Sequence, residues 1–143
     1  MRQIPIYLTG LLFAFMMIAC GGGEDANEGP KESAFKNVKV YDYVTDMPRF
    51  PGGDEGLNRY IKKNLKYPEE AKSNGEEGVA LVGFIIDSTG IVHEPKVENK
   101  VEDYFRDEAL RLVNEMPKWD AGLNDGKPVN VRYVLPVEFE LEK

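Results

Sequence analysis

The strongest constraint on the fold of this sequence lies near its C-terminus, where apolar residues occupy every second position of residues 129–141. Successive side chains of a β-strand point to opposite faces of a sheet, so a period of two predicts a strand with one face in a core. This is the cleanest strand signal in the chain. The alternating apolar residues are Val129, Val131, Tyr133, Leu135, Val137, Phe139 and Leu141.

Two further strands are predicted upstream of this segment. Residues 79–86 are apolar on both faces and rich in β-branched side chains, which is typical of a central strand. The tight turn at residues 87–90 predicts a hairpin with a return strand over residues 91–98. Pro95 lies in that return strand and indicates an edge or a bulge, because proline cannot donate a hydrogen bond to a neighbouring strand. Residues 38–44 alternate only weakly and favour one more short strand.

The remaining apolar patterns predict helices. Apolar residues recur at helical spacing in residues 54–66 and in residues 105–116, and a proline follows the end of each segment. Pro68 can open a second short helix over residues 68–73. The order helix, helix, strand, strand, helix, strand predicts an α+β domain, with a small antiparallel three-stranded sheet and helices packed on one face.

The N-terminus predicts export and lipid attachment. Residues 1–19 carry a single charge, on Arg2, and end in an apolar run that is shorter than the roughly 20 residues of a spanning helix. Cys20 follows directly, and Met17-Ile18-Ala19-Cys20 resembles the bacterial lipobox, in which the cysteine is acylated and becomes the new N-terminus. An incidental cysteine in an uncleaved signal anchor is the alternative.

These features divide the chain into three parts. Residues 1–19 are predicted to be a lipoprotein signal peptide, residues 20–37 the lipidated Cys20 with a flexible Gly-rich tether, and residues 38–143 the folded domain. Glu24 and Asp25 have two interpretations that remain open, a surface-export signal or solubilising charge in a linker.

Composition excludes several classes of function. The net charge of −7 argues against nucleic-acid binding, which needs a basic footprint. The chain has one cysteine and one histidine, His93, so it offers neither a Cys-based zinc cluster nor paired-His metal chemistry. His93 has no acid at motif spacing, and its expected role is that of an ordinary surface or edge histidine. We therefore expect no enzyme, no metal, no cofactor and no small-molecule substrate, and we interpret Trp119 as a core aromatic.

Several short motifs follow one another in an order that is more specific than any of them alone. Together they resemble the TonB C-terminal domain family over residues 47–141. The motifs are Met47-Pro48-Arg49-Phe50-Pro51-Gly52-Gly53, Tyr67-Pro68 with Ala71, the strand that opens at Gly78, the turn from Asp87 to Gly90, Asp107 with Ala109, Met116-Pro117 with Trp119, and Gly126-Lys127-Pro128-Val129 before Leu135-Pro136-Val137.

This resemblance implies a binding function. The family captures an extended peptide from outer-membrane receptors by strand addition to a sheet edge, usually that of the last strand. An edge strand supports this mode because its N–H and C=O groups are unpaired. The peptide-binding edge implied here consists of Val129, Asn130, Val131, Arg132, Tyr133, Val134 and Leu135.

The sequence also departs from an energy-transducing TonB protein, which keeps an N-terminal membrane helix and a long Pro-rich linker. We therefore expect a TonB-like envelope lipoprotein of a Gram-negative bacterium, anchored by lipid in the outer membrane on its periplasmic or surface face. Its expected partners are envelope proteins, including TonB-dependent outer-membrane receptors. Two alternatives are an energy transducer whose signal anchor stays uncleaved, and a structural lipoprotein that keeps the fold without peptide capture.

Overall fold

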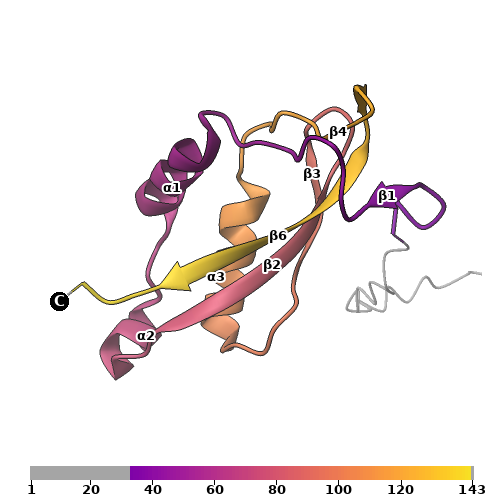
Figure 1. Cartoon of the computed structure of the whole chain (residues 1–143). Coiled ribbons are helices and arrows are strands. Elements are labelled where there is room, and N and C mark those ends of the chain that lie inside the picture. The colour runs from indigo at the N-terminus through magenta and orange to yellow at the C-terminus, as the bar shows by residue number, and fades with distance from the viewer. Residues whose placement is uncertain (1–32, 143) are drawn as a thin grey trace, which may run out of the picture. The chain divides into compact units, whose positions relative to one another are not determined.

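The computed structural model describes residues 33–142, so the predicted signal peptide, Cys20 and most of the predicted tether lie outside the described residues. None of the helices in the described part has the length and apolar character needed to cross a membrane. The elements are β1 (Val40–Tyr41), α1 (Gly53–Asn64), α2 (Glu69–Asn74), β2 (Gly78–Ile86), β3 (Val92–Val97), α3 (Asp103–Asn114), β4 (Leu123–Asn124), β5 (Lys127–Pro128) and β6 (Asn130–Phe139) (Figure 1).

The α+β class predicted from the sequence is confirmed, but the main sheet has four strands in the order β1-β6-β2-β3 rather than three. β2 is antiparallel to both β3 and β6, whereas β1 runs parallel to β6, so the sheet is mixed. β1 contains only two paired residues, Val40 and Tyr41, so it is shorter than the strand predicted over residues 38–44. β4 and β5 form a separate small hairpin, whose Asp125-Gly126 turn has positive φ at both residues.

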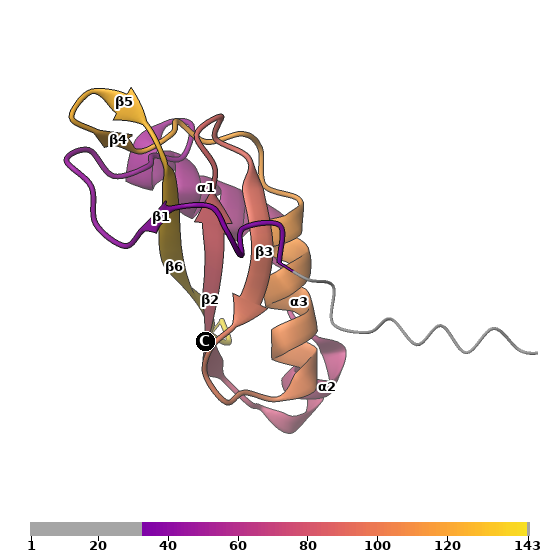
Figure 2. The ribbon, with the colours of Figure 1, turned by 90° about the vertical axis from the view of Figure 1, so that its right-hand side faces the viewer.

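The core lies between the sheet and α3, on one face of the sheet (Figure 2). Even-numbered residues of β2 and odd-numbered residues of β6 point to this face, and α3 covers them with its apolar stripe. Trp119 is 3% exposed and packs edge-on against Phe50, which confirms its interpretation as a core aromatic. The fully buried side chains of the cluster include Ala80, Val82, Ile86, Ala109, Leu112, Val113, Val137 and Phe139.

The edge strand β3 contains an irregularity where the sequence predicts one. The register between β2 and β3 shifts between Gly83 and Ile85, and Glu94 has a φ of 51°, which is unusual for a residue with a side chain. Pro95 follows immediately. The predicted edge or bulge at this proline is confirmed.

The first described residues lie against the other face of the sheet. The rings of Phe35 and His93 are 5.1 Å apart, and Ser33 Oγ donates a hydrogen bond to Glu94 (2.8 Å). Residue His93 pairs with Ile85, whose side chain points away from the core. The chain therefore crosses the outer face from β3 before it reaches β1 beside β6 (Figure 2).

Candidate functional site

The predicted peptide-binding edge is only partly free. β6 lies between β1 and β2, and β1 pairs with Asn130 and Val131. Val129 lies just before β6, and its N–H donates to Gly122 O (3.0 Å). No strand in residues 33–142 pairs with this side of β6 beyond Val131. β1 therefore covers the first part of the predicted edge, and the part of β6 without a partner strand lies beyond the residues paired with β1 and runs past Leu135 to the end of the strand.

The backbone hydrogen bonds of the sheet show which groups of β6 face the free side. Asp87 N donates to Ile91 O (3.0 Å), and Glu98 N donates to Leu81 O (2.8 Å). Odd-numbered residues of β2 therefore bond toward β3 and even-numbered ones toward β6, since backbone groups alternate along a strand. The register pairs every even-numbered residue of β2 with an odd-numbered residue of β6. It follows that even-numbered residues of β6 direct their N–H and C=O groups to the free side.

Pro136 fits this assignment. A proline inside a fully paired strand would leave a gap in the ladder, because its nitrogen carries no hydrogen. Position 136 is even-numbered, so the nitrogen of Pro136 points to the free edge. Among the described residues, no strand pairs with Pro136 on that side, so its missing N–H costs the sheet no hydrogen bond. The donors left on this edge are the N–H groups of Val134 and Glu138, and the acceptors include the C=O groups of Val134, Pro136 and Glu138.

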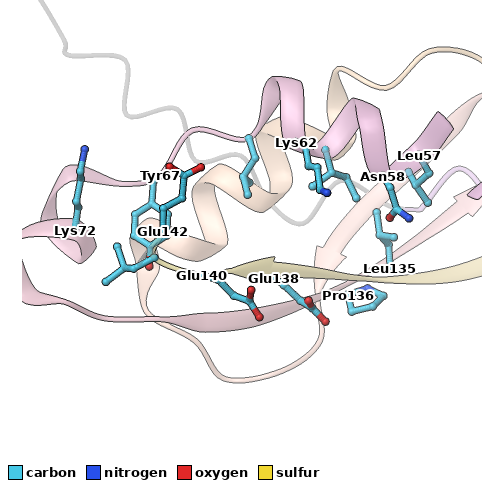
Figure 3. A pocket seen from close by; sticks show the side chains of 13 residues that line it. Leu57, Asn58, Lys62, Tyr67, Lys72, Leu135, Pro136, Glu138, Glu140 and Glu142 are labelled. Carbon is cyan, nitrogen blue, oxygen red and sulfur yellow. The ribbon is translucent and has the colours of Figure 1, made fainter. Parts of the chain in front are cut away.

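A groove of about 1050 Å³ lies between the free side of β6 and α1 (Figure 3). Leu57, Ile61 and Leu65 line it from α1 and the loop that follows, and Leu135 lines it from β6. Leu57 is buried, but Ile61 and Leu65 are only half-buried, so the wall formed by α1 presents apolar surface to the groove. The periodicity of residues 54–66 predicts this apolar face, but it does not reveal that two of its members remain accessible.

Hydrogen bonds to α3 fix the position of α1 beside the groove. Tyr60 Oη donates to Leu112 O (3.0 Å), and Arg111 Nη2 donates to Asn64 O (2.7 Å). Burial of Tyr60, reinforced by Glu115, raises the pKa of its phenol, so it remains a neutral donor at ordinary pH. Arg111 Nη2 also forms an ion pair with Glu108, whose Oε1 lies 2.6 Å away. The wall is therefore anchored by polar contacts at one end and in the middle of the helix.

Charged residues line the groove with opposite signs on its two sides. Lys62 lies on α1 and Lys72 on α2, whereas Glu138 and Glu140 come from β6 and the residue after it. All four side chains are exposed. Figure 3 shows Glu138 and Glu140 on the side of β6 that faces away from α1, together with Pro136, while Leu135 points toward α1.

The described residues offer no metal site, and the single histidine of the chain lies beside a carboxylate. No group of three or more His, Cys, Asp or Glu side chains in residues 33–142 is arranged to hold a metal ion. His93 Nε2 lies 2.7 Å from Asp87 Oδ2. Burial of Asp87 would raise its pKa, but hydrogen bonds from Thr89, His93 and the backbone N–H of Ile91 outweigh it and lower the pKa to about 2. Asp87 is thus an ionised acceptor that holds the hairpin turn.

The comparison with protein families agrees with the motifs in the sequence. The model of the Gram-negative bacterial TonB protein C-terminal family matches residues 63–141, which contain α2, β2, β3, α3 and β6. The NMR solution structure of the TonB C-terminal domain of Helicobacter pylori is similar at 25% identity and a TM-score of 0.46, over 61% of this chain and 78% of that one. No curated protein matches the chain.

The family match begins after most of α1, so the wall of the groove formed by α1 precedes the matched region. The matched residues make up more than half of the 143 residues of the chain, and they include the whole of β6 with its free edge. The family is associated with transport at the Gram-negative cell envelope and not with catalysis. This chain belongs to the TonB C-terminal domain family.

Proposed function

We propose that this protein is a TonB-like lipoprotein of the cell envelope whose domain captures an extended segment of a membrane transport or receptor partner. The segment adds to the sheet as a new strand beside the part of β6 that lies beyond β1, where Val134 offers the first free donor. The observation that supports this proposal most directly is the free edge of a long, regular strand beside a groove. Outer-membrane receptors are the partners that family membership favours.

The chemistry of the edge favours recognition of backbone over side chains. Val134 and Glu138 each offer a donor and an acceptor to an incoming strand, and Pro136 offers an acceptor. Each net hydrogen bond contributes about 0.5–1.5 kcal/mol. Ordering the backbone of the bound segment costs about 1–2 kcal/mol per residue, so burial in the groove must supply the remainder. We therefore expect weak to moderate affinity.

Removing one donor tests strand addition. Val134→Pro deletes an N–H group that faces the free side, while the pairing of β6 with β2 uses the neighbouring odd-numbered residues. We expect this substitution to weaken binding of a short peptide that alternates valine and threonine about three- to tenfold. The matched control is Val134→Thr, which keeps the donor and should bind within about twofold of the wild type. NMR titration measures both affinities and locates the bound peptide.

Thermal unfolding of both variants checks that the domain remains folded. Val134 is 44% exposed, so neither replacement empties the core. Equal binding by Val134→Pro and Val134→Thr would contradict pairing at this edge. A wild-type domain that binds no peptide at millimolar concentration would instead favour a structural lipoprotein.

The lipid anchor is tested separately at Cys20. We propose cleavage before this residue and acylation of its thiol, on the basis of the preceding Ile18-Ala19 and the short apolar run. Cys20→Ser is expected to leave unprocessed precursor or to release the protein from the membrane fraction. The intact mass of the wild-type protein, extracted from membranes, measures the outcome. A mass that includes residues 1–19 and lacks lipid would favour the energy transducer with an uncleaved anchor.

A further inference from the structure

We propose that the segment captured by β6 alternates apolar residues with basic residues, and that the basic ones face Glu138 and Glu140. This inference rests on the proposed function and adds the chemical class of the partner. The occupant is an extended segment of another protein in which every second residue is apolar and lysine or arginine occupies positions between them.

The register of an added strand fixes which face each of its side chains occupies. In paired strands, residues that lie opposite each other point to the same face of the sheet, whether the strands are parallel or antiparallel. Residues of the segment opposite Leu135 and Val137 therefore point toward the helices. Residues opposite Glu138 and Glu140 point to the outer face. The alternation of β6 is thus imposed on the segment.

The inner positions require apolar side chains. They enter the space between β6 and α1, where Leu57, Ile61 and Leu65 form the wall. Two of these three wall residues are only half-buried, and covering them removes apolar surface from water. Lys62 also lines this side and disfavours a cation there. Uncharged apolar residues cover the exposed wall and also avoid repulsion from Lys62.

The outer positions favour cations. Glu138 and Glu140 lie two residues apart on one face, about 7 Å from each other along an extended strand. Neither has an ion-pair partner among the described residues, whereas Arg132 on the same face is 3.4 Å from Asp42. An exposed cross-strand ion pair changes affinity about 1.5- to 5-fold, and like charges opposite each other weaken pairing. With two such positions, β6 should bind a basic segment more tightly than an acidic one.

The experiment compares three acetylated and amidated peptides of equal length, in which valine alternates with lysine, threonine or glutamate. We expect the wild-type domain to bind the lysine peptide most tightly and the glutamate peptide most weakly, with a spread of about tenfold at low salt. This spread should shrink in 1 M NaCl, where the Debye length is about 3 Å. A fourth peptide with serine in place of valine, beside lysine, should bind at least tenfold more weakly than the valine–lysine peptide.

Charge reversal assigns the preference to the two carboxylates. Glu138→Lys should make the lysine and glutamate peptides bind about equally, and Glu138→Lys with Glu140→Lys should invert the order. Asp107→Lys is the matched control, because it makes the same charge change at an exposed residue of α3. It should leave the wild-type order intact.

The outcomes separate this inference from strand addition itself. If the threonine peptide binds at the edge of β6 but the lysine and glutamate peptides bind equally, the basic preference is wrong and strand addition stands. Tightest binding of the glutamate peptide overturns the preference in the same way. If none of the valine peptides produces NMR shifts along β6 at millimolar concentration, both proposals fail.

Discussion

Replacing Leu112 with alanine is expected to lower the free energy of unfolding by about 3–5 kcal/mol. Leu112 is completely buried, on the face of α3 that packs against the sheet. Truncation removes apolar contacts and leaves a cavity, because neighbours such as Val113 and Val137 are also fully buried and cannot move far enough to fill it. Urea denaturation followed by circular dichroism measures the loss.

Leu81→Ala provides the matched control for this prediction. It makes the same chemical change on the outer face of β2, where Leu81 is 36% exposed. Less apolar surface is lost there and water can enter the space, so we expect a loss of about 1 kcal/mol or less. Equal losses at both positions would show that the core does not lie between α3 and the sheet.

Gly90→Ala should destabilise the domain by about 3 kcal/mol or more, for two independent reasons. Gly90 has a φ of 90°, which L-residues with a side chain rarely adopt. A Cβ at this position would also lie 1.9 Å from the carbonyl oxygen of Trp119, a contact that forces the backbone apart. The displacement would break the hydrogen bond from Trp119 N to Gly90 O (2.8 Å) and loosen the buried indole.

Gly126→Ala separates the two causes. Gly126 has a φ of 77°, but a Cβ built there meets no heavy atom within 4 Å. The substitution therefore introduces backbone strain without a clash, and we expect it to cost about 1–2 kcal/mol. Thermal unfolding of both variants measures the difference. If Gly90→Ala is no more destabilising than Gly126→Ala, the close approach of the hairpin turn to Trp119 does not constrain the fold.

The candidate site was only partly accessible to sequence reasoning. Strict alternation over residues 129–141 correctly predicts which side chains of β6 enter the core, because side-chain direction follows from local strand geometry. The same pattern cannot tell which backbone groups remain free. That depends on the neighbour of β6 on its second side, and Val40 and Tyr41 reach this position from the distant N-terminal part of the domain.

The groove, too, was predicted from the sequence only in part. The periodicity of residues 54–66 predicts an amphipathic helix, but placing α1 beside the free edge of β6 requires contacts with α3. Tyr60 bonds to Leu112 O, and Asn64 O accepts from Arg111, so residues separated by roughly half of the domain determine where the wall lies. The exposure of Ile61 and Leu65 follows from that placement and not from their spacing.

Periodicity, turn residues and prolines thus specified the helices, the hairpin and the two faces of β6, since each depends on conformations within a few residues. The ordered motifs also identified the family. The tertiary structure alone decided that β1 covers Asn130 and Val131, that the free edge lies beyond these pairings, and that α1 forms a groove with it. These features arise from pairing and packing between distant segments, whose free energies leave no periodic signal in the sequence.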